Sequence, residues 1–310
     1  MLNQIRTKFD VIIIGGGAGG LSTALWCDEL GLSALLLEEK NELGGQLLWT
    51  HNEIKNYLGR ETENGRELRD AFLRQIEKRN FELYLQARIA EIDLEKKEVV
   101  LAGETLISAR AIVIATGIRR RTLKVAGEDE FRTRGIIESG KKNADSVAGK
   151  SVLVVGGGDA AFENALILAE TAEKVTLAHR RKAFSARKEF IEQVKNHPKV
   201  TILTETSVQK ISGNERIESV ELKNSATGEI LVLPVDALLI RIGVEPNTGL
   251  FRGKLELDDS GYIEINRNCA TSLESVFAVG DVANPLAPTV SSAVGMGATA
   301  AKAIFSLLNS

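Results

Sequence analysis

The sequence of 310 residues contains only two cysteines, Cys27 and Cys269. So few cysteines argue against a disulfide framework and against a cysteine-ligated zinc site, and they fit a reducing compartment. No apolar stretch approaches the roughly 18 residues of a membrane span, and the charged segment 1–10 has no signal-peptide core after it. We therefore expect a cytoplasmic protein with no membrane partner and no metal.

The sequence also has no excess of charge of either sign. Its 39 basic and 42 acidic residues give a formal net charge of −3, which provides no electrostatic footprint for a nucleic-acid partner. Hydrophobic residues make up 44% and charged residues 26%, as in soluble globular proteins, and the length suits roughly two domains. Prolines are few, at 5, whereas the 28 glycines are clustered and predict tight turns.

An internal repeat organises the chain. The segments Val11–Gly20 (VIIIGGGAGG) and Val152–Ala161 (VLVVGGGDAA) each read as a buried parallel strand followed by glycines. The helices expected next are 21–30 and 162–172, and the second strands expected are 33–37 and 174–178. This order of strand, turn, helix and strand is that of a dinucleotide-binding unit.

The glycines have the spacing that a phosphate-binding turn requires. The first copy reads Gly15-x-Gly17-x-x-Gly20, and the second reads Gly156-x-Gly158-x-x-Ala161, an accepted variant. Such glycines allow the tight turn, the approach of backbone to a pyrophosphate and close helix packing, while helix N–H groups hold the phosphates. Glycines that merely turn the chain are the alternative, which a matched pair in equal register makes minor.

The second strand of each copy ends differently. In the first copy it ends in Glu38-Glu39, and a carboxylate there accepts hydrogen bonds from ribose hydroxyls while repelling a 2′-phosphate. In the second copy it ends in the segment 179–182 (His-Arg-Arg-Lys), followed by Arg187 and Lys188, and guanidinium groups suit a 2′-phosphate. We expect an unphosphorylated adenosine in the first site and NADPH rather than NADH in the second, the alternative being a solvated basic loop.

Further elements follow from hydrophobic periodicity. A helix is expected over 64–80 and another over 290–308. Strands are expected within 81–92 and over 98–101, 109–114, 200–203, 217–222, 230–233, 237–242 and 275–279.

Several short motifs occur in a fixed order along almost the whole chain. They are GGGAGG at 15–20, GGQL at 44–47, NYLG at 56–59, ATG at 115–117, GGGDAA at 156–161, HRR at 179–181, GVEPNT at 243–248 and FAVGD at 277–281. This ordered set resembles the low-molecular-weight thioredoxin reductase family of FAD and NADPH flavoproteins. The resemblance implies an α/β fold with two Rossmann-like dinucleotide-binding domains, an NADPH domain (118–246) being inserted into a split FAD domain (1–117 and 247–310). It also implies a homodimer.

The resemblance assigns ligand roles residue by residue. Gln46 and Asn56 would lie near the isoalloxazine ring, Asp281 would take the ribityl chain, and the last helix would direct its positive end at the flavin. The residues implied for FAD are Gly15, Gly17, Ala18, Gly20, Glu38, Glu39, Gly45, Gln46, Leu47, Asn56, Ile89, Ala115, Thr116, Gly117, Gly280, Asp281, Val290 and Ala293. Those implied for NADPH are Gly156, Gly158, Asp159, Ala160, Ala161, Glu163, His179, Arg180, Arg181, Arg187, Ile242 and Gly243.

The sequence departs from the family at its redox dithiol. The positions that match the family's CxxC read Ser139-Gly140-Lys141-Lys142. The flavin would then pass electrons directly to an external acceptor, as in the similar ferredoxin or flavodoxin NADP reductases, and such a carrier is the acceptor that we expect. The alternatives are a disulfide reductase that acts directly from flavin, with or without Cys27, and a non-catalytic FAD- and NADPH-binding sensor or subunit.

One segment bears on the electron acceptor. Residues 119–142 hold eight basic and four acidic residues in an acidic protein. Such a surface either docks an acidic electron carrier or is a solvated hinge. No side chain need act as an acid or base in the transfer of hydride from NADPH to FAD, so positioning would dominate catalysis.

Overall fold

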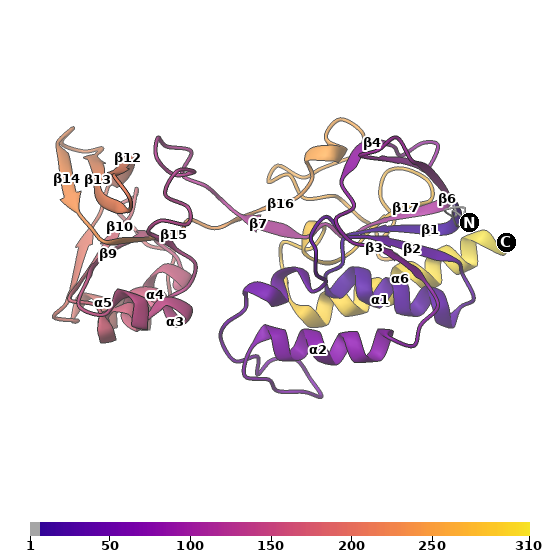
Figure 1. The fold of residues 1–310 in the computed structure, drawn as a ribbon, viewed down its shortest axis with the longest axis horizontal. Coiled ribbons are helices and arrows are strands. Elements are labelled where there is room, and N and C mark those ends of the chain that lie inside the picture. The colour runs from indigo at the N-terminus through magenta and orange to yellow at the C-terminus, as the bar shows by residue number, and fades with distance from the viewer. Residues whose placement is uncertain (1–6) are drawn as a thin grey trace. The chain divides into compact units, whose positions relative to one another are not determined.

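The structure, a computed structural model, describes residues 7–310. The expectation about a signal peptide concerned segment 1–10, and residues 1–6 of it lie outside the described residues. The chain forms two compact units (Figure 1). Unit 1 comprises the chain up to Arg119 together with Glu245–Ser310, and unit 2 comprises Arg120–Val244. These limits lie close to the crossings expected after Gly117 and residue 246.

Unit 1 is built on a seven-stranded sheet in the order β3-β2-β1-β6-β5-β4, with β17 paired to β6. The strands are β1 (Lys8–Ile14), β2 (Ala34–Leu37), β3 (Glu82–Tyr84), β4 (Ile89–Asp93), β5 (Glu98–Leu101), β6 (Leu106–Ile114) and β17 (Val276–Ala278). The pairs formed by β1, β2, β3, β6 and β17 are parallel, whereas β4 and β5 form antiparallel pairs. Residues 11–14 and 34–37 are buried on both faces, as parallel strands covered on both sides require.

The helices of unit 1 are α1 (Ala18–Glu29), α2 (Gly65–Ile76) and α6 (Val290–Leu308), with short 3-10 helices η1 (Gly45–Trp49), η3 (Gly249–Phe251) and η4 (Gly280–Val282). Figure 1 shows α1, α2 and α6 along one side of the sheet. The start of α2 is fixed by Asn64, whose side chain accepts a hydrogen bond from the Glu67 N–H at 3.0 Å. A capping box of Thr289 and Ser292 starts α6 in the same way.

Helix α6 is long and apolar enough to cross a membrane by length and composition alone, with a mean hydropathy of 1.3, which the sequence analysis did not expect. In the structure it packs against α1. Ser22 Oγ donates to the Val294 carbonyl at 2.7 Å, and a Cβ on Gly297 would lie 2.6 Å from the Gly19 carbonyl oxygen. Small residues therefore let the two helix backbones approach closely, and α6 buries one face, with 28% of its apolar stretch buried.

Unit 2 contains a five-stranded parallel sheet in the order β11-β10-β9-β15-β8. Its strands are β8 (Ile136–Ile137), β9 (Ser151–Gly156), β10 (Lys174–Ala178), β11 (Val200–Leu203) and β15 (Ala237–Arg241). Its helices are α3 (Gly140–Asn143), η2 (Asp145–Val147), α4 (Asp159–Thr171) and α5 (Lys188–Lys195). One apolar core joins the sheet to α4, and a second core joins the other face to an antiparallel sheet.

That antiparallel sheet consists of β12 (Thr206–Gly213), β13 (Ile217–Asn224) and β14 (Ile230–Pro234). The sequence predicted β13 and β14 but not β12, because an irregularity between Val208 and Lys210 interrupts the alternation of polar and apolar residues. The two chain crossings contain β7 (Ile118–Arg120) and β16 (Val244–Pro246), which pair as a two-stranded ladder.

Candidate functional site

The glycine turn of unit 1 joins β1 to α1 in a shape that only glycine permits. Gly15 has φ +111°, and a Cβ there would overlap the Ala115 backbone, whose carbonyl carbon would be 2.8 Å away. A Cβ on Gly20 would overlap the Gly15 carbonyl group. Gly17 begins α1 with no side-chain cap. The first N–H groups of α1 are thus left to a ligand, as at other phosphate-binding helix starts.

Glu38 closes this turn from the end of β2. Its Oε2 accepts a hydrogen bond from the Gly16 N–H at 2.7 Å, and its Oε1 accepts one from the Lys40 N–H at 2.9 Å. The side chain is buried, with 9% of the residue surface exposed. An ionised carboxylate has about four acceptor positions, so it keeps capacity for the hydroxyls of a ribose.

Unit 1 holds a cavity of about 550 Å³ beside this turn. That volume lies in the usual range for cofactor sites. Its wall includes these residues expected to bind FAD: Gly15, Gly17, Ala18, Glu38, Glu39, Gly45, Gln46, Leu47, Ile89, Ala115, Thr116, Gly117, Gly280, Asp281, Val290 and Ala293. Two expected residues do not line it. Gly20 lies behind the turn, where it permits helix packing, and Asn56 lies exposed on the loop after η1.

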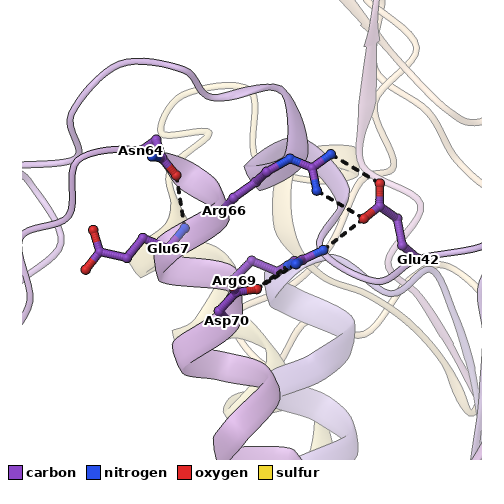
Figure 2. A network of polar contacts seen from close by, with 6 residues as sticks. All are labelled: Glu42, Asn64, Arg66, Glu67, Arg69 and Asp70. Atoms are coloured by element: carbon purple, nitrogen blue, oxygen red, sulfur yellow. Dashed lines mark hydrogen bonds and ion pairs between the residues drawn. The ribbon is translucent and has the colours of Figure 1, made fainter.

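A network of charged side chains holds the Gly44–Gly45 loop at the cavity wall (Figure 2). Glu42 accepts hydrogen bonds from Arg66 at 3.2 and 3.3 Å and from Arg69 at 2.9 Å. The alkyl chain of Arg69 covers Gly44, because a Cβ on Gly44 would lie 2.8 Å from Arg69 Cδ. The start of α2 and the cavity loop are therefore tied together.

The opposite wall combines an acid with a helix start. Asp281, in η4, borders the cavity, and burial raises the pKa of its carboxyl above the ordinary value. Within the part of the chain that the structure describes, this carboxyl has no hydrogen-bond partner. Val290 and Ala293, in the first turns of α6, line the same cavity, and no acidic residue in that first turn opposes the positive end of the helix dipole. A polyhydroxyl chain that ends in an electron-poor ring suits this wall, so the residues present fit FAD.

The glycine turn of unit 2 repeats the plan of the first. Gly156 has φ +155°, and a Cβ there would overlap the Arg241 carbonyl and lie 2.8 Å from Ala161 Cβ. Gly158 begins α4 with no side-chain cap. The register pairs Gly156 with Arg241, so the turn lies at the carboxyl edge of the parallel sheet, next to Ile242 and Gly243. Ligands of open α/β sheets bind at this edge.

The basic segment at the end of β10 faces this turn. The ring of His179 lies against Gly157, whose added Cβ would be 2.6 Å from His179 Nε2, and burial lowers the pKa of the imidazole. Arg180 and Arg181 are exposed beside it. Within residues 7–310 neither guanidinium has an ion-pair partner, so both charges are available to an anion.

Other residues expected at the NADPH site lie on or beside helix α4. The Arg187 backbone N–H and Nε donate to the Asp159 carboxylate at 2.7 and 2.9 Å, and the guanidinium lies 4.5 Å from the Phe190 ring centroid. Arg187 therefore bridges the start of α4 and α5. Ala160 is exposed on the first turn of α4, and Glu163 is half-buried farther along.

Neither cysteine is placed for thiol chemistry. Cys27 and Cys269 are free and buried, and burial raises the pKa of the Cys27 thiol to about 12 and that of Cys269 to about 11. Residues 139–142, which the resemblance places at the family's dithiol, contain no sulfur, and the Gly140 N–H donates to the buried Asn164 Oδ1 at 2.7 Å. A nucleophilic cysteine needs a low pKa and access, and both are missing here.

The basic residues of 119–142 are largely engaged within the chain. Ion pairs join Arg119 to Glu245, Arg132 to Asp129, Arg134 to Glu130 and Lys142 to Glu138. Four of the eight basic side chains are thus held in ion pairs with acidic neighbours.

Sequence reasoning missed several cavity residues. Lys40 and Trp49 line the wall, with Lys40 Nζ 4.9 Å from the Trp49 ring centroid. Asn247 Nδ2 donates to the Thr116 carbonyl at 2.8 Å and so joins the two parts of unit 1 at the cavity. Asn247 belongs to the motif at 243–248, which could have indicated it, although the spacing of the motif assigns no function to this residue.

Comparison with known proteins supports both nucleotide units. A family model described as pyridine nucleotide-disulphide oxidoreductase matches residues 9–297. The chain is 34% identical over 305 residues to a thioredoxin reductase of Mycolicibacterium smegmatis, covering 96% of each protein. The solved thioredoxin reductase of Lactococcus lactis (FR conformation) is similar with a TM-score of 0.83 and 30% identity, covering 97% of this chain and 99% of that one. The bacillithiol disulfide reductase of Bacillus cereus shares the fold at 20% identity, with a TM-score of 0.79 over 97% and 99% of the chains.

Proposed function

Because this chain belongs to the pyridine nucleotide-disulphide oxidoreductase family, we propose that it reduces a disulfide substrate with electrons that pass from NADPH to FAD and then directly to that substrate. At the coarser level it is a thioredoxin reductase-like flavoprotein oxidoreductase whose cofactors are FAD and NADPH. The proposal adds the acceptor, the direct route and the residues that serve each nucleotide.

The observation that carries the proposal is the pair of glycine turns, because the side chains beside them carry opposite charges. The turn of unit 1 has the buried carboxylate of Glu38 at its rim, which suits ribose hydroxyls. The turn of unit 2 has Arg180 and Arg181, which suit a 2′-phosphate. A carboxylate repels phosphate and a guanidinium attracts it, so we assign FAD to unit 1 and NADPH to unit 2.

The route to the acceptor follows from the cysteines. With both thiols buried and their pKa values raised, no thiol pair of the chain can receive electrons from the flavin. FAD supplies a two-electron carrier that accepts hydride from the nicotinamide. In the overall reaction NADPH and one proton cleave the S–S bond of the substrate, which yields NADP⁺ and two thiols. The chain's own residues bind and orient the nucleotides, and Asp281 and the start of α6 border the cavity that would hold the flavin.

A disulfide is a better acceptor than a carrier protein on two grounds. Relatives at 34% and 35% identity are named thioredoxin reductase. Four of the eight basic residues of 119–142, which favoured a ferredoxin or flavodoxin, are held in ion pairs with acidic neighbours. Neither ground favours a non-catalytic sensor.

The test is a set of acceptors offered to the FAD-loaded enzyme with NADPH under anaerobic conditions. The set comprises low-molecular-weight disulfides, thioredoxin, ferredoxin, flavodoxin and a quinone. We expect a disulfide to give the highest kcat/KM, with two thiols released for each NADPH consumed. Turnover with ferredoxin or flavodoxin but with no disulfide would contradict the proposal.

A further inference from the structure

Two arginines meet at the carboxyl edge of the unit 2 sheet. Strand β15 ends at Arg241, and the neighbouring β8 is followed directly by Glu138. The Arg120 Nη1 donates to the Glu138 carbonyl oxygen at 2.7 Å, and the Arg241 Nη2 donates to the same oxygen. Two guanidinium groups therefore converge on one neutral acceptor.

Their charges are not neutralised within the chain. Within residues 7–310, neither Arg120 nor Arg241 forms an ion pair with a carboxylate. The Glu138 carboxylate, which is the nearby acid, is paired with Lys142. Once the charges of Glu138 and Lys142 cancel, the two positive charges of Arg120 and Arg241 remain at this point of the sheet edge.

Repulsion between the two like charges makes this arrangement unfavourable without a ligand, with Arg241 half-buried and Arg120 exposed. Burial, together with the charge of the neighbouring Arg120, lowers the pKa of Arg241 to about 10. Burial also lowers the pKa of Arg120, while the charge of Glu138 opposes this effect. A charge taken partly out of water is costly unless it is paired, so an anion bound between the two groups would be favourable.

Other groups on this edge would bind the phosphates of the coenzyme. The order β10-β9-β15-β8 places the 2′-phosphate residues Arg180 and Arg181 at β10 and the glycine turn at β9. Arg241 ends β15, and Arg120, the last residue of β7, contacts Glu138 just after β8, so both lie on the side of β9 away from β10. Neighbouring strands are about 4.8 Å apart, so the pair lies beyond the turn that would hold the pyrophosphate.

From this placement we infer that Arg120 and Arg241 form an oxyanion subsite for the acidic groups of the disulfide substrate, so that the enzyme prefers small disulfides that carry carboxylates or phosphates. The inference rests on the proposed function. Guanidinium groups recognise such anions through paired charge-assisted hydrogen bonds. The pair also adjoins Ser139–Lys142, the segment that matches the dithiol of the resembled family.

Binding can be tested apart from turnover. The probe is suberate, a dicarboxylate with the shape of 3,3′-dithiodipropionate in which two methylene groups replace the sulfurs. Calorimetry with the FAD-loaded protein would compare the wild type with Arg120→Gln and Arg241→Gln, because glutamine removes the charge and keeps N–H donors. Lys210→Gln removes an exposed positive charge from β12 of the same unit and is the matched control. We expect each arginine variant to weaken suberate binding by about tenfold, the effect of one charged hydrogen bond, and the control to leave it unchanged.

Kinetics supply the second arm. Both arginine variants should raise KM for 3,3′-dithiodipropionate, while KM for the neutral bis(2-hydroxyethyl) disulfide should stay the same. Variants that weaken NADPH binding instead of suberate binding would overturn the inference, because the pair would then serve the coenzyme. Equal suberate affinity in wild type and variants, or no binding at all, would also overturn it.

The two proposals can fail separately. If suberate binds through the arginines but no disulfide is reduced, the proposed function is wrong and the anion subsite stands. If disulfides are reduced without any dependence on these arginines, the anion subsite is wrong and the proposed function stands. Circular dichroism and flavin content show whether each variant is folded. The two arginines are replaced one at a time, so that each variant tests the site independently.

Discussion

The carboxylate of Glu38 accepts a hydrogen bond from the Gly16 N–H at 2.7 Å and so joins the end of β2 to the glycine turn of unit 1. A second bond, from the Lys40 N–H, fixes the other carboxylate oxygen. The negative charge is therefore held at the place where an adenosine ribose would meet the turn. This contact shapes the turn, and we propose that it also selects the nucleotide.

Replacing Glu38 by glutamine should weaken FAD binding by at least about tenfold, because charge-assisted bonds to the backbone contribute about 1.5–3 kcal/mol each and the amide lacks one acceptor. Equilibrium dialysis of the apoprotein with FAD measures this. Glu91→Gln, an exposed change on β4, is the control and should bind FAD normally. Unchanged FAD affinity in the Glu38 variant would remove this residue from the site.

Gly20→Ala should abolish FAD retention, because a Cβ there would overlap the Gly15 carbonyl and displace the turn. Gly295→Ala is its matched control. A Cβ on Gly295 meets nothing within 4 Å, so alanine in helix α6 should raise the free energy of unfolding by about 0.5–1 kcal/mol. The flavin spectrum and thermal unfolding of the two purified variants test this contrast. Normal flavin content in Gly20→Ala would contradict the described turn.

Asp281 gives a pH dependence that can be measured on the apoprotein. Burial raises the pKa of its carboxyl in the folded state above 3.8, so between 3.8 and the raised value the folded state binds more protons than the unfolded state. Its contribution therefore makes the apoprotein less stable as pH rises through that window. Asp281→Asn should remove this loss.

Thermal unfolding of the two apoproteins across acidic pH measures the effect. The difference in Tm between variant and wild type should grow as pH rises and then level off. The same variant should bind FAD more weakly at neutral pH, where the carboxylate would accept hydroxyl protons. A Tm difference that is constant with pH would show that Asp281 titrates normally.

Local patterns predicted much of this molecule. The strands 11–14 and 152–155 and both glycine turns follow from short runs of sequence, because a buried parallel strand and a positive φ each demand particular residue types. Most of the cavity wall followed from the resemblance. Asn56 did not reach the wall, since the loop after η1 carries it to the surface.

Features that depend on distant contacts could not be predicted. The convergence of Arg120 and Arg241 on Glu138 arises only when β8 and β15 pair. The basic run after β10 gave no signal for helix α5, which begins at Lys188. The pairing of Arg187 with Asp159 is likewise a tertiary contact between two elements.

Replacing Arg180 and Arg181 together by alanine should weaken NADPH binding by about a hundredfold, since two charged contacts to the 2′-phosphate are lost. NADH lacks that phosphate, so its binding should change little. Fluorescence titration with both coenzymes measures the ratio, with Lys210→Ala as the control for a lost charge. Equal loss for NADPH and NADH would refute the assignment of the 2′-phosphate.

Cys27→Ser should leave kcat unchanged and lower the free energy of unfolding by about 1–3 kcal/mol, because a hydroxyl replaces a thiol in an apolar core. With its pKa near 12, the native thiol should also resist iodoacetamide at pH 8. Turnover assays and mass spectrometry of the alkylated protein check both points, and Cys269→Ser provides the comparison. Lost turnover in a variant that retains FAD would restore a thiol mechanism.

The central claim is that one chain holds FAD in unit 1 and NADPH in unit 2 and passes a hydride between them. Anaerobic titration of the FAD-loaded protein with NADPH, followed by flavin absorbance, tests it most directly. The account predicts prompt bleaching of the oxidised flavin band with about one NADPH per FAD, and weaker bleaching when NADH replaces NADPH. A flavin that stays oxidised under excess NADPH, or a polypeptide that cannot be loaded with FAD, would contradict it.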